Sequence, residues 1–207
     1  SNIKKLKPIY LDNNSTTMID PRVLERMLPY MKDDFGNSSS TEHAFGWKSN
    51  DAVNQSRESI ANLLSCSPNE IIFTSGATES NNISILGTME KCGYDGHIVT
   101  PKTEHKSVLD IVQSVEKKGA HVTYLDVMAD GLVDINKFKD SLRDDTRMVS
   151  VMMANNEIGV IQPIELIGSI CREREIIFHV DAAQSFGKID IDLSKLSIDL
   201  MSISAHK

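Results

Sequence analysis

The amino-acid sequence predicts an α/β fold in which helices flank a mainly parallel sheet. Short runs rich in β-branched residues alternate with helical stretches, which is typical of parallel strands joined by crossover helices. Most of these runs are nearly continuous apolar segments, as expected for strands covered on both faces. Of the 207 residues, 40% are apolar and 25% are charged, which is the composition of a globular protein with about one domain, or two at most.

Six short runs are rich in the β-branched residues that pack well in a pleated sheet. We expect strands at 70–74, 97–100, 121–127, 148–153, 176–180 and 199–204. Helices between successive strands supply the crossovers that parallel pairing requires.

The clearest helix lies between the second and third expected strands. Its apolar residues recur at the i, i+3, i+4, i+7 spacing of one helix face: Val108, Ile111, Val112 and Val115. Gly119 follows Lys117 and Lys118 as a C-terminal cap. Another helix, from Ala77 to Met89, follows the glycine-containing turn after the first expected strand.

Other helices show a start signal or an apolar face. Pro21 and Pro163 suit the first turn of a helix, where a missing amide costs nothing. Asp134 begins a shorter helix that buries Ile135, Phe138 and Leu142. A long helix with a polar opposite side is marked by Ala52, Val53, Ser56, Ile60, Leu63 and Leu64. Segment 35–41, rich in Gly, Asn and Ser, is expected to be a flexible loop.

Charge and cysteine content exclude several classes of function. Lys and Arg number 22 against 29 Asp and Glu, a net charge of -7 that argues against binding nucleic acid or an anionic membrane. No stretch approaches the ~20 consecutive apolar residues of a membrane span. Cys66, Cys92 and Cys171 are widely spaced and form no CxxC pair or metal-ligand cluster, which fits a reducing compartment and predicts no metal site.

Polar clusters follow the expected strands. Ligands of open parallel sheets bind beyond the carboxyl ends of the strands, so these clusters form the candidate site. They are 74–80, 103–106, 155–157, 181–184 and 204–207.

The first cluster is a glycine-containing turn that leads from a strand into a helix. Free amides at the helix start and the hydroxyl of Thr78 make an anion site suited to phosphate. The alternative is an ordinary helix cap at Ser75 or Thr78 with no ligand. No Gly-Lys-Ser/Thr follows at the spacing of a nucleotide-binding loop, so a single phosphate monoester is favoured.

Asp181 appears where an almost wholly apolar strand leaves the core. An unpaired buried carboxylate is unfavourable, so a cationic partner is expected, and a pyridinium nitrogen could serve. The alternative is that Asp181 caps the next short turn. Gln184, three residues later, could present an amide donor to the same ligand.

Lys207 and His105 complete the candidate set. Lys207 is either a surface charge or an amine able to form a Schiff base with an aldehyde. His105 is either structural or able to stack on an aromatic ligand and relay protons. A phosphate anchor, a buried aspartate, a stacking group and an imine-forming lysine are the four parts that pyridoxal phosphate needs.

With these residues in view, the chain resembles the cysteine desulfurases of the NifS and IscS type, which are fold-type I pyridoxal-phosphate enzymes related to class V aminotransferases. The resemblance runs essentially from end to end, and its ordered set of motifs is highly specific. The motifs lie at 10–17, 35–37, 75–81, 103–106, 155–159, 179–184 and 206–207.

The resemblance implies a role for each candidate residue. Lys207 would form the Schiff base with the cofactor, Asp181 would keep its pyridine nitrogen protonated, and His105 would stack on the ring and help to move protons. Contacts to the ring substituents would come from Asn156 and Gln184. The residues that would hold the phosphate are Ala77, Thr78, Ser204 and His206.

The resemblance also implies an activity and partners. L-cysteine would be converted to L-alanine, and its sulfur would pass as a persulfide to iron-sulfur scaffold and sulfur-acceptor proteins, for cluster assembly and tRNA thiolation. A homodimer in the cytoplasm, or alternatively in the mitochondrial matrix, is expected. The alternatives are another fold-type I enzyme, such as an aminotransferase or selenocysteine lyase, and an inactive truncated scaffold.

The same resemblance predicts how the domains are organised. Residues 1–15 would pack with a small domain, residues 16–207 would form the incomplete large cofactor-binding domain, and the small domain would lie beyond residue 207. None of the three cysteines matches the position of the family nucleophile, which is therefore expected outside these residues.

Overall fold

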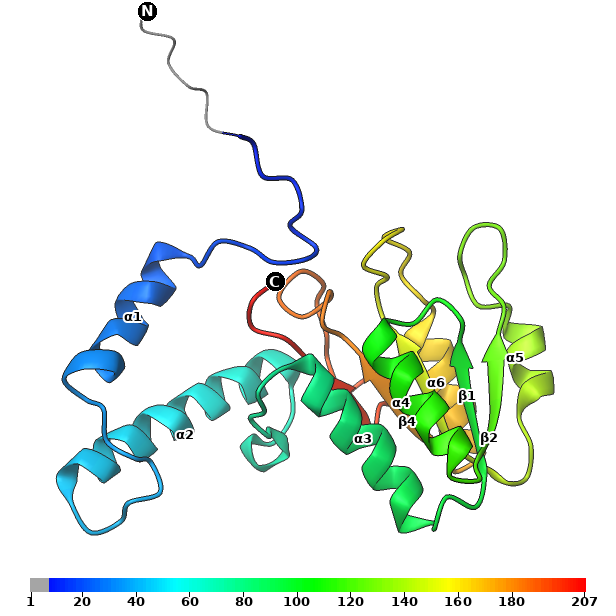
Figure 1. Ribbon diagram of the computed structural model, residues 1–207, viewed down its shortest axis with the longest axis horizontal. Coiled ribbons are helices and arrows are strands. Elements are labelled where there is room, and N and C mark those ends of the chain that lie inside the picture. Colours follow the sequence, from blue (N-terminus) through cyan, green and yellow to red (C-terminus); the bar gives the residue numbers. More distant parts are fainter. Residues whose placement is uncertain (1–7) are drawn as a thin grey trace, which may run out of the picture.

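The computed structural model describes residues 8–207 and has an α/β architecture (Figure 1). Five strands form one sheet in the order β2-β1-β3-β4-β5, and every neighbouring pair is parallel. The strands are β1 (His97–Pro101), β2 (His121–Leu125), β3 (Thr146–Met152), β4 (Ile177–Asp181) and β5 (Leu200–Ser202). The predicted fold class is confirmed.

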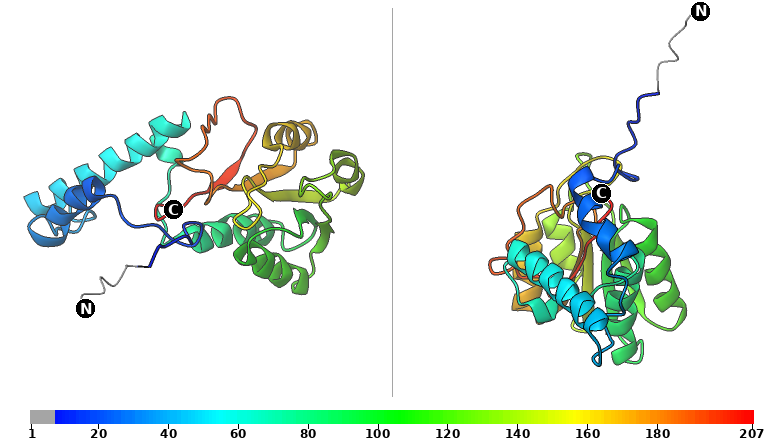
Figure 2. Two further views of the ribbon diagram at one scale, coloured as in Figure 1. Left: turned by 90° about the horizontal axis from the view of Figure 1, so that it is seen from above. Right: turned by 90° about the vertical axis from the view of Figure 1, so that its left-hand side faces the viewer.

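Helices cover both faces of the sheet (Figure 2). One face packs against α3 (Ala77–Lys91) and α4 (Lys106–Lys117), and the other against α5 (Ile135–Ser141) and α6 (Ile164–Glu173). Successive strand residues point to opposite faces, so Ile98 and Met148 join the first core while Val99 and Val149 join the second. Two cores on one sheet explain why the strands are nearly continuous apolar runs.

The helix signals in the sequence are largely confirmed. Pro21 opens α1 (Pro21–Lys32), and Asp134 caps α5. The four apolar residues at helical spacing in α4 are all buried. Pro163 stands at the N-cap of α6, one position before its expected place in the first turn.

The expected strand at 70–74 is wrong. Glu70 ends a short 3-10 helix, η1 (Pro68–Glu70), and the residues after it pair with no strand in the described chain. Ile72 is 72% exposed. The guanidinium of Arg57 donates to the carbonyl of Ile71 and lies 4.9 Å from the ring centroid of Phe73, so this extended segment is held by α2 instead of the sheet. Its β-branched composition indicated extended backbone, but backbone shape alone does not supply a strand partner.

The long helix α2 (Ala44–Leu64) starts earlier than its apolar residues suggested. Leu63, expected on the buried face, is 70% exposed. Together α1 and α2 form an arm that extends away from the sheet (Figures 1 and 2). Most of α2 therefore has little of the protein to pack against. At its C-terminal end the predicted pattern does mark a buried face, because Leu64 belongs to the core and Ile60 packs against it.

Within residues 8–207, no helix combines the length and apolarity that crossing a membrane would require.

Candidate cofactor-binding site

A pocket of about 380 Å³ lies at the carboxyl ends of the strands, beside the start of α3. It brings together all nine of the predicted cofactor-binding residues. These are Ala77, Thr78, His105, Asn156, Asp181, Gln184, Ser204, His206 and Lys207. They come from α3 and from the segments that follow β1, β3, β4 and β5, because the carboxyl ends of parallel strands share one edge of the sheet.

The start of α3 is open to an anion. Its N-cap is Gly76, which provides no side-chain cap, and a Cβ placed there would meet nothing within 4 Å. The alternative interpretation, a cap by Ser75 or Thr78, is wrong. The N–H of Ser75 instead donates to Glu79 Oε2 at 2.6 Å. Ala77 and Thr78, the first residues of the helix, line the pocket, so the positive end of the helix dipole lies at the pocket.

Asp181 is the last residue of β4 and is 2% exposed. Its Oδ1 accepts the N–H of Ala183 at 3.0 Å, and its Oδ2 accepts from Asn81 Nδ2 at 3.0 Å. Asp181 therefore does bind the following turn. It belongs to none of the salt bridges among residues 8–207. Since a carboxylate can accept about four hydrogen bonds, it keeps acceptor capacity for a cationic ligand.

Two titratable neighbours of Asp181 do not neutralise it. Burial lowers the pKa of His179 to about 4, although the charge of Asp181 acts in the opposite direction. Burial raises the pKa of Glu104 well above 4.5; the Met152 N–H opposes this rise and the charge of Asp181 adds to it. Both effects favour the uncharged forms, so neither neighbour offsets the carboxylate charge.

His105 caps α4 with its own ring. Its Nδ1 accepts the backbone N–H of Ser107 at 3.1 Å and lies 2.8 Å from Ser107 Oγ. A backbone N–H can only donate, so Nδ1 carries no proton and the neutral ring is protonated at Nε2. The ring edge that carries the proton is thereby set by the fold.

Lys207 is half-buried and lines the pocket. It lies five residues beyond the end of β5, so the lysine reaches the site on a loop. With the described residues its amine forms no hydrogen bond and no salt bridge. The nitrogen is thus free to react with a bound carbonyl compound.

The N-terminal segment lies against the site, which the sequence analysis missed. Asn14 Nδ2 donates to the carbonyl of Asn156 at 2.9 Å, and Gln184 Nε2 donates to the carbonyl of Asn14 at 2.8 Å. The N–H and hydroxyl of Thr17 both donate to the carbonyl of His206, at 3.2 and 3.0 Å. Gln184 therefore has one amide hydrogen left for a ligand. The motif at 10–17 was the signal that could have found these contacts.

Segment 1–15 is predicted to pack with a small domain, and residues 1–7 of it lie outside the described residues. Within the described residues, Asn14 contacts two residues of the cofactor pocket.

The three cysteines lie elsewhere. None lines the cofactor pocket, and Cys66 lines a separate hollow of about 230 Å³ near η1 and β5. Burial raises the pKa of Cys171 to about 12 and also raises that of Cys66. A thiol is nucleophilic only as its thiolate, so neither of these two is activated.

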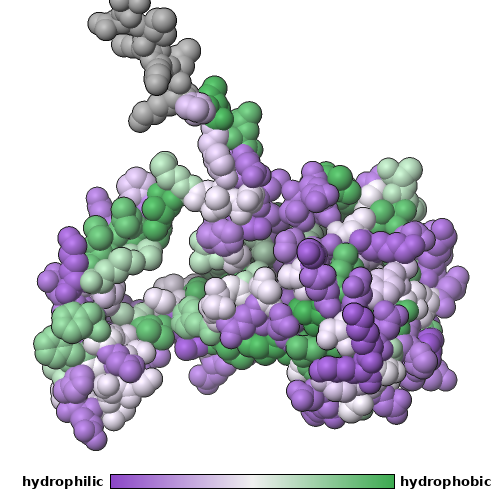
Figure 3. All heavy atoms as spheres, viewed as in Figure 1, coloured by the Kyte–Doolittle hydropathy of each residue, from purple (hydrophilic) through white to green (hydrophobic). Residues whose placement is uncertain are grey.

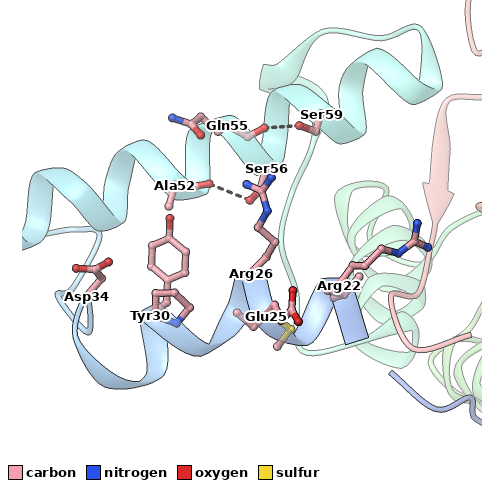
Figure 4. A pocket seen from close by; sticks show the side chains of 12 residues that line it. Arg22, Glu25, Arg26, Tyr30, Asp34, Ala52, Gln55, Ser56 and Ser59 are labelled. Carbon is pink, nitrogen blue, oxygen red and sulfur yellow. Dashed lines mark hydrogen bonds between the residues drawn. The ribbon is translucent and has the colours of Figure 1, made fainter. Parts of the chain in front are cut away.

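A larger hollow of about 870 Å³ separates α1 from α2 and contains none of the predicted site residues. Figure 4 shows Tyr30 and Arg26 reaching from α1 toward α2 across this space. The residues that line this hollow all come from the arm, and none belongs to the polar clusters that follow the strands.

The residues present fit a pyridoxal phosphate. An uncapped helix start suits its phosphate, a buried carboxylate without a cationic partner suits its ring nitrogen, and an unpaired lysine suits its aldehyde. This combination on a parallel α/β sheet defines the class of fold-type I pyridoxal-phosphate proteins. A sequence profile of the aminotransferase class-V family matches residues 9–207, and the chain belongs to that family.

Named relatives of this chain are cysteine desulfurases. The chain is 55% identical over 202 residues to the cysteine desulfurase IscS of Dechloromonas aromatica and 56% identical over 203 residues to that of Colwellia psychrerythraea. Each match covers 97% of this chain and 50% of the relative, so the chain spans about half the length of these relatives. Both the class V aminotransferases and these desulfurases depend on pyridoxal phosphate.

Two solved structures closely match the fold of this chain. A structure described as SspA in complex with cysteine has a TM-score of 0.92 and 41% sequence identity, and the match covers 95% of this chain and 57% of that one. A NifS-like protein also has a TM-score of 0.92, with 40% identity, and the match covers 96% of this chain and 55% of that one.

Proposed function

We propose that the full protein is a pyridoxal-phosphate-dependent cysteine desulfurase. The observation that carries this proposal is the convergence, in one pocket, of the open start of α3, the buried Asp181 and the unpaired Lys207. Identity of more than 50% to relatives named as IscS directs the choice among the activities of the family.

Each side of the pocket has a separate task in this proposal. Ala77, Thr78, Ser204 and His206 hold the phosphate. Asp181 holds the ring nitrogen in its protonated form, and His105 lies against the ring. Asn156 and Gln184 contact the ring substituents. When bound, pyridoxal phosphate supplies an electron sink that stabilises negative charge on the α-carbon of an amino acid.

Lys207 and His105 handle protons in the proposed reaction. The Lys207 amine would hold the cofactor, and as a free amine it would accept and return the proton at the α-carbon of a bound amino acid. His105 presents Nε2–H, the one ring position left after Nδ1 binds Ser107. The N-terminal segment is held beside the pocket by hydrogen bonds from Asn14 to Asn156 and from Thr17 to His206.

The proposed substrate is L-cysteine, as in the solved complex of SspA with cysteine. An enzyme thiolate attacks the substrate sulfur, and an S–S bond forms as the carbon–sulfur bond of the substrate breaks. The electron pair of that bond stays on the β-carbon, which takes up a proton, so the substrate leaves as L-alanine and the sulfur remains as a persulfide. The attacking cysteine lies in the half of the protein that this chain does not span, since none of the three cysteines here lines the pocket. Scaffold and acceptor proteins for iron-sulfur clusters and tRNA thiolation are the proposed recipients of the sulfur.

A homodimer and a second, small domain complete the proposed molecule. The arm has much apolar surface to cover: in the described chain α1 has no buried residue, and Trp47 of α2 is 60% exposed. Figure 3 shows apolar side chains gathered over α1. The relatives are about twice as long as the matched region, which leaves room for the small domain. The bacterial relatives support a cytoplasmic location, with the mitochondrial matrix as the alternative.

The deciding experiment measures products from L-cysteine with purified full-length protein and added pyridoxal phosphate. Alanine and sulfide released in equal amounts, in the presence of a reductant, support the proposal. Amino transfer to a 2-oxo acid without sulfide would identify an aminotransferase instead, and release of neither product would identify an inactive scaffold.

A further inference from the structure

A continuous hydrogen-bonded chain joins His105 to Asp181 beneath the pocket. His105 Nδ1 lies 2.8 Å from Ser107 Oγ, Ser107 Oγ lies 3.1 Å from Asn81 Nδ2, and Asn81 Nδ2 lies 3.0 Å from Asp181 Oδ2. Asn81 is fully buried on α3 and was not among the predicted site residues. The chain therefore links α3, the start of α4 and the end of β4 through side chains alone.

The direction of every hydrogen bond in this chain follows from one backbone donor. The Ser107 N–H donates to His105 Nδ1, so Nδ1 is an acceptor and the Ser107 hydroxyl must donate to it as well. The Ser107 oxygen then accepts from Asn81. Both amide hydrogens of Asn81 are used, one toward Ser107 and one toward the carboxylate of Asp181.

The Asn81 amide is oriented so that its oxygen is left without a hydrogen-bond donor in the described chain. This oxygen, Oδ1, is buried. Turning the amide over would place Oδ1 against the carboxylate of Asp181 and against the Ser107 oxygen, whose hydrogen already points to His105, so it would face two acceptors. A buried acceptor left unpaired is unfavourable, so the contact to Asp181 is the interaction that selects this orientation.

We infer that Asn81 is a positioning residue for the cofactor: it orients the Asp181 carboxylate, stabilises its charge, and ties it to the helix whose start receives the phosphate. This inference rests on the proposed function. Asn81 lies three residues after Thr78 on α3, so one rigid helix carries the phosphate site and the support of the carboxylate. The two contacts that must grip opposite ends of the cofactor are thereby kept at a constant separation.

The chemical consequence concerns the proton shared between Asp181 and a bound pyridine nitrogen. A carboxylate that accepts an N–H from Asn81 and another from Ala183 is stabilised as the anion, which leaves the proton on the ring. Removing the Asn81 donor makes the carboxylate bind the proton more tightly. The proton then moves from the ring nitrogen toward Asp181.

The test uses the full-length holoprotein and cofactor labelled with ¹⁵N in the ring. Asn81→Leu removes the amide at similar volume. Asn82→Leu is the matched control because, within residues 8–207, Asn82 Nδ2 binds the Thr78 carbonyl of its own helix and Asn82 does not line the pocket. The wild type and Asn82→Leu are expected to show a protonated ring nitrogen. Asn81→Leu is expected to shift that signal toward the neutral value and to release the cofactor roughly tenfold faster, as for loss of a hydrogen bond to a charged group.

The outcomes separate this inference from the proposed function. A wild type that binds no pyridoxal phosphate overturns the proposed function and the inference with it. A wild type that binds it, with an Asn81→Leu signal and release rate equal to those of the wild type, overturns the inference alone.

If Asn81→Leu does not fold, variants of Ser107 test the inference in its place. Ser107→Ala removes the second anchor of the Asn81 amide and is expected to shift the ring-nitrogen signal in the same direction by less. Ser107→Thr keeps the hydroxyl and is expected to restore the wild-type signal. An unchanged signal and release rate in Ser107→Ala would then overturn the inference.

Discussion

Glu104 Oε1, in the segment after β1, accepts the backbone N–H of Met152, the last residue of β3, at 2.6 Å. The side chain is buried, and its Oε2 has no partner in the described chain. Met152 lines the pocket, so this contact ties a residue of the pocket lining to the segment after β1. The interaction needs an acceptor but no charge.

Glu104→Gln is therefore expected to preserve stability at neutral pH, whereas Glu104→Ala should cost about 2 to 4 kcal/mol because it leaves the Met152 N–H unpaired and opens a cavity.

The folded pKa of Glu104 is raised above 4.5, so the folded state holds its proton more tightly than the unfolded chain does. The contribution of Glu104 to the free energy of unfolding is fully present below pH 4.5, and it is lost as the pH rises toward the pKa of the folded state. Denaturant unfolding at several pH values should show a smaller decline for Glu104→Gln than for the wild type.

Lys207→Ala is expected to abolish covalent cofactor binding and turnover while the fold is kept. The residue lies on a loop after β5 and forms no hydrogen bond with the described residues, so its removal disturbs little packing. Absorbance of the protein-bound cofactor checks the first effect and circular dichroism the second. A retained covalent signal would place the anchoring amine elsewhere, and Lys188→Ala serves as the control lysine.

Asp181→Ala is expected to weaken cofactor retention and reduce turnover severely. Removing one partner of a buried charge pair costs about 3 to 5 kcal/mol, which corresponds to roughly two to four orders of magnitude in affinity. Equilibrium titration with pyridoxal phosphate measures the loss. Asp126→Asn is the control, since its ion pair with Lys102 at 2.7 Å is exposed and neither residue lines the pocket. Equal affinities for the two variants would contradict the role of Asp181.

Asn14→Ala is expected to loosen the N-terminal segment over the pocket. It removes the hydrogen bond to the Asn156 carbonyl, worth about 1 kcal/mol, but leaves the backbone contact with Gln184. Hydrogen exchange of segment 10–17 in the holoprotein should rise several-fold. Asn13→Ala, the neighbouring exposed asparagine, should leave it near the wild-type rate, and identical exchange in both variants would contradict the assignment.

Replacing the three cysteines together, as Cys66→Ser, Cys92→Ser and Cys171→Ala, is expected to leave persulfide formation intact in the full-length protein. None of these thiols lines the pocket, and burial raises the pKa of Cys171 to about 12. Persulfide on the protein after incubation with L-cysteine can be detected by mass spectrometry. Loss of that persulfide in a folded triple variant would make one of the three the nucleophile.

Local sequence patterns predicted most of the fold and the candidate pocket. The spacing of Val108, Ile111, Val112 and Val115 identified α4, and the polar residues after each strand identified the lining of the pocket, because parallel strands bring their carboxyl ends to one edge. The segment 70–74 shows where this reasoning fails. Its composition favours extended backbone, but pairing depends on a neighbouring strand that only the folded chain can supply.

The sequence by itself determined the α/β class, five of the six expected strands, the family, and nine residues of the pocket lining, since each depends on local periodicity or on motifs contiguous in the chain. Only the tertiary structure decided how those residues are supported. The contacts of Asn81 with Asp181 and of Asn14 with Gln184 join residues 100 and 170 positions apart. Such pairs leave no periodic trace in the sequence, because their geometry arises when separate helices, strands and loops pack together.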